Sequence, residues 1–214
     1  MKEAALLIID VQVGIIDGFK AYRGNDVLDR INILTEKARA SSIPVIYVQH
    51  DGETGGPLET GSSGWQIHPT IKPKTGDLII RKKASDSFFQ TTLQDVLTKL
   101  NIGHLIVAGC QTEYCVDTTV RRAVSNGYDV TLVSDAHTTI DNSCLTAYQI
   151  IAHHNALLNG FDAGEHAIGQ PRVVTPVEIM FGQAAEQEQP DMLVGEYPRR
   201  VLAIESLDSL LDWQ

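Results

Sequence analysis

The stretch Leu105–Val116 limits what this chain can fold into more than any other part of the sequence. It begins with a short apolar run, Leu-Ile-Val-Ala, which predicts a strand buried in a sheet, and the run breaks at Gly109. A buried strand that leads directly into a helix is typical of folds in which the two elements alternate. The helix is indicated by apolar residues that recur at helical spacing beyond the break, at Val116, Val120, Ala123 and Val124.

Similar patterns occur along most of the chain. Apolar runs predict further strands at 5–9, 43–48, 78–80, 130–133 and 173–174, and helices are predicted at about 27–40, 89–100, 113–126 and 143–158. Either Asn25 or Asp26 is expected to cap the first helix, and a helical turn is expected after Pro176. The alternation indicates an α/β protein, in which helices cover both faces of a mostly parallel sheet.

The composition argues against several classes of protein. Hydrophobic residues make up 43% and charged residues 21% of the chain, which is typical of a soluble globular protein. The net charge of −10 opposes binding to nucleic acid or to an anionic membrane. No apolar run is long enough to cross a bilayer, and Ala4–Ile9 is too short for the core of a signal peptide. Three cysteines without CxxC spacing favour a reduced, cytoplasmic protein.

The composition changes after about Gly182. We interpret residues 1–182 as one domain and residues 183–214 as a C-terminal extension. The extension ends in the amphipathic segment Arg200–Trp213, whose apolar side chains need to be covered. We expect the extension to pack on the domain or at a subunit interface, and we predict a homo-oligomer, a dimer or larger.

Three chemically reactive residues follow predicted strands: Asp10 follows the first, Lys82 the third and Cys115 the fourth. In open parallel sheets, ligands bind beyond the carboxyl ends of the strands. Each residue taken alone also has an ordinary interpretation: Asp10 as a helix cap, Lys82 as a surface cation and Cys115 as a small core residue. Together they suggest a thiol nucleophile, a carboxylate that accepts its proton and a lysine that keeps the carboxylate ionised. The lysine and the helix N-terminus are both expected to lower the pKa of the thiol.

Three segments carry recognisable motifs. Residues 6–12 are Leu-Leu-Ile-Ile-Asp-Val-Gln, residues 77–82 are Asp-Leu-Ile-Ile-Arg-Lys followed by Asp-Ser-Phe-Phe-Gln-Thr-Thr-Leu at 86–93, and residues 109–116 are Gly-Cys-Gln-Thr-Glu-Tyr-Cys-Val. In this order they resemble the isochorismatase-like cysteine hydrolase superfamily, which includes nicotinamidases, N-carbamoylsarcosine amidases and ureide hydrolases. The resemblance extends over about residues 4–182 and includes a further strand end at Asp135-Ala136.

The resemblance implies a three-layer α/β sandwich with a six-stranded, mostly parallel sheet in the order 3-2-1-4-5-6, and a Cys-Asp-Lys triad. Cys115 would attack a carbonyl-type carbon, Asp10 would take the thiol proton and pass it to the leaving group, and Lys82 would orient Asp10. Lys82 rather than Lys83 matches the family's spacing from the preceding turn and to the following helix.

The resemblance also implies the surroundings of the triad. A cis peptide bond is expected between Cys110 and Gln111, and the amides of Gln111 and Cys115 are candidates for an oxyanion hole. The candidate residues of the substrate pocket are Gln12, His50, Trp65, His68, Phe88, Thr112 and Tyr114.

A metal site is considered at His50, Asp51 and His68, because a His-Asp-His cluster can bind a metal ion. The Asp-x-His spacing of the family's metal sites is absent there. We therefore expect no metal and no cofactor.

Three functions are considered. Hydrolysis of a C–N bond in a small-molecule amide, ureide or related compound, through a thioester at Cys115, is favoured by the triad. An ether hydrolase of the isochorismatase type, with Asp10 as the acid, needs no thiol, so the presence of Cys115 speaks against it. A non-catalytic interaction protein on this fold is the third alternative, because a fold alone does not establish a function. The expected partner is a small-molecule substrate.

Overall fold

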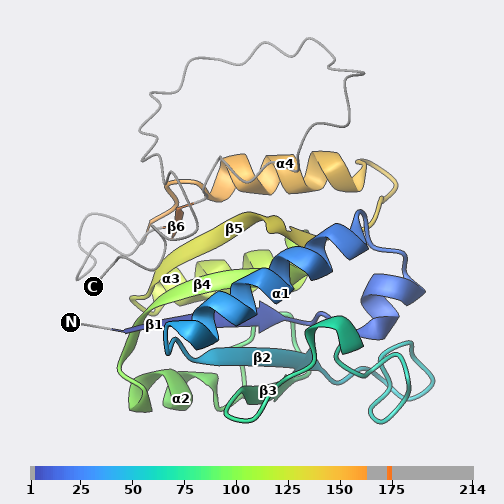
Figure 1. Cartoon of the computed structure of the whole chain (residues 1–214). Coiled ribbons are helices and arrows are strands. Elements are labelled where there is room, and N and C mark those ends of the chain that lie inside the picture. The colour runs from blue at the N-terminus through green and yellow to red at the C-terminus, as the bar shows by residue number, and fades with distance from the viewer. Residues whose placement is uncertain (1–2, 163–172, 175–214) are drawn as a thin grey trace, which may run out of the picture.

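The computed structural model describes residues 3–162 and 173–174 of the chain. Its centre is a sheet with the strand order β3-β2-β1-β4-β5-β6 (Figure 1). All pairings between the described strands are parallel, which confirms the predicted fold class and strand order. The strands are β1 (Glu3–Ile9), β2 (Val45–His50), β3 (Leu78–Lys82), β4 (Ile102–Cys110), β5 (Asp129–Thr138) and β6 (Val173–Val174).

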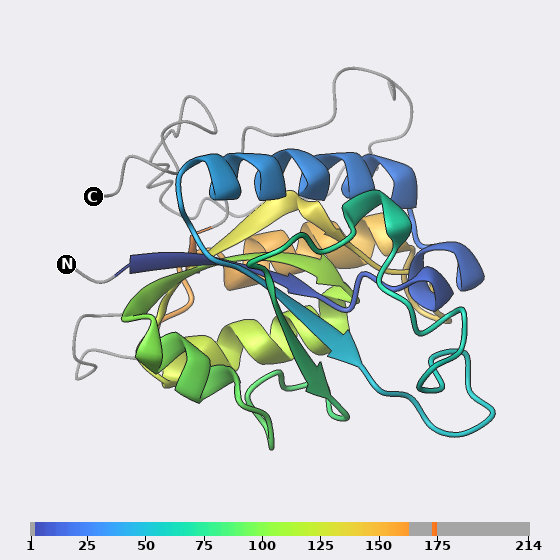
Figure 2. The same cartoon turned by 60° about the horizontal axis from the view of Figure 1, so that its bottom comes forward.

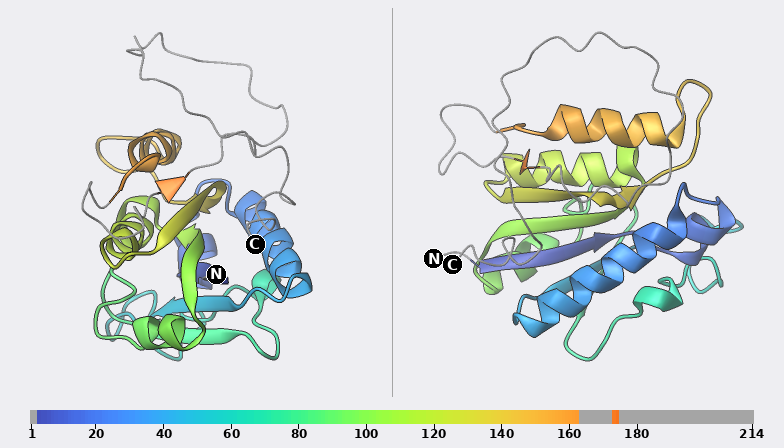
Figure 3. Two further views of the ribbon diagram at one scale, coloured as in Figure 1. Left: turned by 90° about the vertical axis from the view of Figure 1, so that its left-hand side faces the viewer. Right: turned by 45° about the horizontal axis from the view of Figure 1, so that its top comes forward.

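Helices cover both faces of the sheet. Figures 2 and 3 show α1 on one face, with α2, α3 and α4 on the other. Short helical turns are π-helical at Gly14–Gly18 and Thr112–Val116 and of the 3-10 type at Pro69–Ile71. The α-helices are α1 (Gly24–Ala40), α2 (Leu93–Lys99), α3 (Asp117–Ser125) and α4 (Ala147–Leu158).

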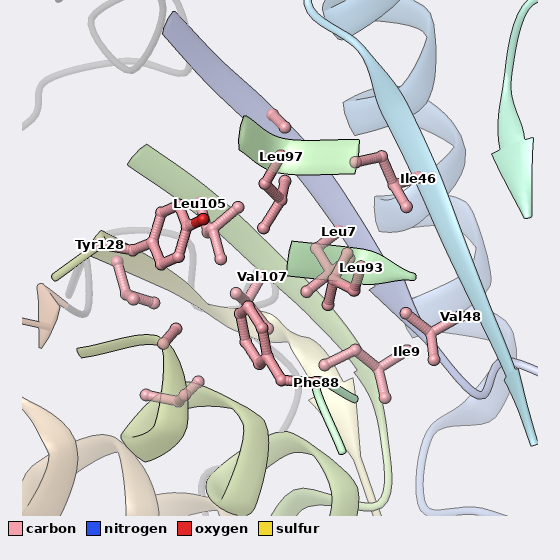
Figure 4. Close-up of a cluster of buried hydrophobic side chains, with 14 of the residues drawn as sticks. Leu7, Ile9, Ile46, Val48, Phe88, Leu93, Leu97, Leu105, Val107 and Tyr128 are labelled. Atoms are coloured by element: carbon pink, nitrogen blue, oxygen red, sulfur yellow. The ribbon is translucent and has the colours of Figure 1, made fainter. Parts of the chain in front are cut away.

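Two hydrophobic clusters fill the spaces between the sheet and its helices. Along β1, Leu7 and Ile9 belong to the cluster on the side of α2 and α3, which Figure 4 shows, and Leu6 and Ile8 belong to the cluster under α1. Side chains alternate across a strand, so a strand covered on both faces has to be apolar throughout. This explains the unbroken apolar run at residues 5–9.

The first helix begins before its expected cap. α1 starts at Gly24, and the N-cap position is occupied by Arg23 in the left-handed conformation, with a φ of 50°. Asn25 and Asp26 lie inside the first turn, and the Asp26 carboxylate pairs with Arg23. The expected cap is therefore wrong, and Asp26 instead places its charge at the positive end of the helix dipole.

The second helix begins later than predicted, at Leu93. Polar side chains hold the preceding segment in turns: Asp86 Oδ1 accepts from Phe88 N at 2.8 Å, and Thr91 Oγ1 donates to Ser87 O at 2.6 Å. Such bonds offer the backbone an alternative to the helix, which explains the missing first turn.

Two further elements differ in length from the prediction. α4 begins at Ala147 instead of about residue 143, because Thr146 and Gln149 form a capping box that sets its first turn. β5 runs beyond the predicted end at residue 133, since His137 and Thr138 pair with β4 after a bulge. The strand was predicted from its apolar residues, so the prediction left out the polar residues at this end of β5.

The helical turn expected after Pro176, the boundary at residue 182 and the extension 183–214 lie outside the described residues. They stay predictions, as does the oligomer. Within the described ranges, no helix has the length and apolar character needed to cross a membrane.

The strand order reverses between β1 and β4, which are neighbours in the sheet. A crevice beyond the carboxyl ends of two such strands is the usual ligand site of an open α/β sheet. Gly109, near the end of β4, lets the two strands approach closely at this point. A Cβ atom on Gly109 would lie 2.1 Å from the carbonyl oxygen of Ile9, and its φ is 129°.

We predict that Gly109→Ala lowers the free energy of unfolding by about 3 kcal/mol or more, because the left-handed backbone and the clash with Ile9 both add strain. Denaturant unfolding measures the loss. Gly127→Ala is the matched control: its φ is also positive, at 88°, but no described atom lies within 4 Å of the added carbon, so it should cost only about 1 kcal/mol. Equal losses would contradict the importance of the close approach.

Candidate active site

The ammonium group of Lys82 lies at the centre of the site. Lys82 is the last residue of β3 and is 2% exposed. Its Nζ lies 2.6 Å from Asp10 Oδ2 and donates to Cys115 Sγ at 3.2 Å and to the carbonyl oxygen of Ala84 at 2.9 Å. Lys83 is exposed, as expected for the next residue of an extended segment. The structure thus brings together Asp10, Lys82 and Cys115.

Lys82 carries its charge in spite of burial. Desolvation alone lowers the pKa of Lys82, but the Asp10 carboxylate and the Cys115 sulfur outweigh it, and the pKa is raised. A buried charge is costly unless it is paired, and the carboxylate of Asp10 supplies the partner. The two side chains therefore form a buried ion pair.

Cys115 lies in the π-helical turn Thr112–Val116, which joins β4 to α3. Single π-helical turns are rare in proteins, and those that occur are often found at functional sites. Burial raises the pKa of the Cys115 thiol to about 12, the Asp10 carboxylate adds to the rise, and the Lys82 ammonium opposes it. The expectation of a lowered thiol pKa is therefore wrong, because desolvation and the Asp10 carboxylate outweigh the lysine. At neutral pH the thiol keeps its proton.

Asp10 supplies the carboxylate beside Lys82. It follows β1 in the left-handed conformation, with a φ of 51°, and its side chain is buried. This backbone conformation is uncommon outside glycine, although aspartate tolerates it better than most residues. The Asp10 amide donates to the carbonyl oxygen of Val48 at 2.9 Å, which fixes the turn against β2. Asp10 Oδ2 and Cys115 Sγ both adjoin the Lys82 ammonium group, at 2.6 and 3.2 Å from Nζ.

His50 adjoins the triad. It is the last residue of β2 and is paired in register with Lys82 of β3. Its Nδ1 lies 3.3 Å from Lys82 Nζ, and burial together with the lysine charge lowers the pKa of His50. A neutral imidazole beside an ammonium group accepts at Nδ1 and carries its own proton on Nε2. Of the pocket candidates, His50 is thus one that the structure brings to the triad.

The peptide bond between Cys110 and Gln111 is cis, at the position that the resemblance implies. Cys110 is fully buried in the core. Gln111 precedes the π-helical turn, and its carbonyl oxygen accepts from the amide of Val116 at 3.2 Å. The amides of Gln111 and Cys115 belong to the segment that carries the thiol, and their role as an oxyanion hole stays a prediction.

Gln12 and Trp65 hold the long loop after β2. The Gln12 amide donates to the carbonyl oxygens of His50 and Trp65, at 3.0 and 2.8 Å, and accepts from the His50 amide at 2.9 Å. Trp65 Nε1 donates to Asp51 Oδ1 at 2.8 Å. The polar groups of Gln12 are therefore occupied by the backbone, and this side chain ties the loop to the end of β1.

Three other pocket candidates have different surroundings. His68 caps the short helix Pro69–Ile71 by accepting from the amide of Thr70. Phe88 lies in the core, and Figure 4 shows it beside Val107 and Ile9. Tyr114 precedes Cys115 and is 54% exposed, so it is available at the surface beside the thiol.

The residues considered as metal ligands have other partners. Asp51 accepts from Arg81 through both carboxylate oxygens, each at 3.0 Å, and His68 Nε2 lies 3.4 Å from Asp17 Oδ2. In the part of the chain that the structure describes, no group of three or more His, Cys, Asp or Glu side chains could hold a metal ion. A reaction without metal or cofactor stays a prediction.

The sequence does not indicate that a buried histidine lies behind the π-helical turn Thr112–Val116. His137 of β5 bonds to Thr112 Oγ1 and to Asn155 Oδ1, each at 2.9 Å. These residues come from separate segments, so no local motif marks them. The available signal was a histidine directly after the strand end at Asp135-Ala136.

Comparison with known proteins places the chain in a family. Residues 4–157 match the isochorismatase domain, and the chain belongs to the isochorismatase family. A solved structure of an isochorismatase family protein is 38% identical, with a TM-score of 0.70 over 82% of this chain and 98% of that one.

Two similar curated proteins are hydrolases by name. A streptothricin hydrolase of Streptomyces noursei is 37% identical over 138 residues, which is 64% of this chain and 55% of that protein. A ureidoacrylate amidohydrolase of Klebsiella pneumoniae is 26% identical over 172 residues, covering 63% of this chain and 73% of that one. The chain thus spans about half the length of the streptothricin hydrolases that it matches.

We predict that alkylation of Cys115 by iodoacetamide accelerates by about tenfold per pH unit from neutral to about pH 10 without levelling off, because only the thiolate reacts and burial keeps it scarce. Mass spectrometry of the Cys115 peptide follows the rate. An unstructured cysteine peptide, with a pKa of about 8.5, should level off in this range. A plateau for Cys115 at the same pH as the peptide would contradict the raised pKa.

Proposed function

We propose that this chain is a cysteine hydrolase that cleaves a C–N bond in a small-molecule amide, ureide or related compound. The observation that carries the proposal is the position of the Lys82 ammonium group, 2.6 Å from Asp10 Oδ2 and 3.2 Å from Cys115 Sγ. A thiol, a proton acceptor and a cation at one point are what thioester chemistry requires. The names of the two similar hydrolases support the same class of reaction.

The first half of the reaction forms a thioester. As Cys115 Sγ attacks the carbonyl carbon, its proton moves to the Asp10 carboxylate, and the carbonyl electron pair moves to the oxygen. The amides of Gln111 and Cys115 are the donors proposed to stabilise this oxyanion. When the oxyanion collapses, the C–N bond breaks, and the leaving nitrogen takes the proton from Asp10. The products of this half are the thioester and ammonia or an amine.

The second half consumes water. Asp10 accepts a proton from a water molecule that attacks the thioester carbon, and the C–S bond breaks when the second oxyanion collapses. The sulfur regains a proton from Asp10, which restores the starting thiol and carboxylate. Lys82 stays an ammonium group throughout, so its role is to orient Asp10 and to stabilise negative charge as it moves to sulfur.

The ether-hydrolase alternative uses Asp10 as an acid and needs no sulfur nucleophile. The contact of Lys82 Nζ with Cys115 Sγ favours the thioester reaction, because an unused thiol has no need of a buried cation. The two reactions make opposite predictions for a variant without the thiol.

We predict that Cys115→Ala abolishes ammonia release from a panel of amides and ureides, since the proposed thioester forms on the Cys115 sulfur. Its melting temperature should stay close to that of the wild type, because the thiol is only partly buried. Cys144→Ala, which removes an exposed thiol, is the control and should keep full activity. Full activity in Cys115→Ala against an enol ether would support the ether hydrolase instead.

We predict that Lys82→Ala lowers kcat by about 100-fold or more, the low end for a positioned acid–base partner, whereas Lys83→Ala has little effect. The two lysines are adjacent, but only Lys82 reaches Asp10 and Cys115. Steady-state kinetics on a substrate from the panel measures both. The reverse pattern would mean that Lys83 is the functional lysine, and no effect in either variant would remove lysine from the mechanism.

A further inference from the structure

A chain of hydrogen bonds runs behind the π-helical turn Thr112–Val116, the nucleophile turn, from Thr112 through His137 and Asn155 to Ser134. It is buried at Thr112 and His137 and half-buried at Asn155 and Ser134. Thr112 Oγ1 lies 2.9 Å from His137 Nδ1, and His137 Nε2 lies 2.9 Å from Asn155 Oδ1. Asn155 Nδ2 donates to the carbonyl oxygen of Ser134 at 3.1 Å. Thr112 and His137 are at most 1% exposed. The chain of bonds therefore joins the π-helical turn to β5 and α4 in the interior.

The last acceptor sets the direction of the whole chain. A carbonyl oxygen only accepts, so Asn155 turns its Nδ2 to Ser134 and its Oδ1 to His137. Oδ1 also only accepts, so His137 Nε2 carries the proton. Burial lowers the pKa of His137 to about 4, which keeps the imidazole neutral and leaves a lone pair on Nδ1. Thr112 Oγ1 is then the donor to Nδ1.

These bonds hold one side of the turn that carries the thiol. Thr112 is the first residue of the turn, and Cys115 follows in the same turn. On the other side, Cys115 Sγ contacts Lys82 of β3 at 3.2 Å. The thiol therefore lies between an anchor on β5 and α4 and an anchor on β3. A displacement of about 1 Å at either anchor is large on the scale that governs catalysis.

We propose that Thr112, His137 and Asn155 are positioning residues that hold the nucleophile turn so that Cys115 Sγ stays between Asp10, Lys82 and the substrate carbon. The interior offers a matched pair for comparison, since Thr131 Oγ1 bonds to His104 Nε2 at 2.8 Å. That pair joins β4 to β5 near the amino ends of both strands, away from the thiol. This inference rests on the proposed function only where its test measures kcat and KM.

The test compares Thr112→Val with Thr131→Val, each of which removes one buried hydroxyl that bonds to a histidine. Both should lower the melting temperature by similar amounts. Only Thr112→Val should lower kcat, by about tenfold or more, with KM changed by less than about threefold. Thr112→Ser, which keeps the hydroxyl, should recover most of kcat. Equal kinetics in Thr112→Val and Thr131→Val would overturn the proposal.

Two readouts need no substrate. Thr112→Val should slow alkylation of Cys115 at about pH 9 by roughly threefold or more, since the sulfur moves away from the Lys82 charge, and Thr131→Val should not. Nitrogen-15 NMR of the full wild-type chain, with the signal of His137 assigned by its loss in His137→Gln, should show the proton on Nε2. An Nδ1-protonated ring or an imidazolium ion would overturn the proposal even if Thr112→Val does not fold. If no amide or ureide is hydrolysed, the proposed function fails while these readouts still decide this inference.

Discussion

The buried ion pair between Lys82 and Asp10 is the interaction on which the site depends. Its two charges come from β3 and from the end of β1, with β2 between them in the sheet. Lys82 therefore has to reach past the end of β2, where its partner in register is His50. A slip of one residue in β3 would turn Lys82 outward and leave the Asp10 carboxylate buried without a partner. The cost of an unpaired buried charge thus ties the register of three strands to the chemistry at their ends.

Much of the fold follows from periodicity in the sequence. The apolar run before Asp10 and the alternation of runs with helical patterns predict the strands and the parallel sheet, because strands covered on both faces are mostly apolar. The predicted helix starts are wrong where local side-chain contacts or an unusual residue conformation determine the path of the backbone. α2 starts late because Asp86 and Thr91 bond to nearby main-chain groups, and α1 starts early behind the left-handed Arg23. Such local competition is not expressed in a pattern of apolar residues.

The candidate site was predictable in part for a similar reason. Asp10, Lys82 and Cys115 each follow a strand that the sequence predicts, so topology alone brings them to one rim. What no strand end could indicate is the degree of burial, and burial reverses the expected direction of the thiol pKa. The strand ends also could not indicate the contact of His137 with Thr112, because the two residues meet only when β4 and β5 pair across a bulge. Properties that depend on solvent exclusion or on contacts between distant segments need the folded structure.

A protonated thiol changes what the lysine does. At rest, the site holds one anion on Asp10, one cation on Lys82 and a neutral sulfur. In the proposed reaction, transfer of the thiol proton to Asp10 moves the negative charge from oxygen to sulfur, and Lys82 Nζ contacts both atoms before the transfer. The net charge of the buried group is therefore the same before and after sulfur is activated. In a site with little water, moving a charge between two partners of one fixed cation costs less than creating a new one. A thiolate at rest beside an ionised Asp10 would instead place two anions against a single lysine, and this repulsion adds to desolvation, the larger cause, in raising the pKa of Cys115.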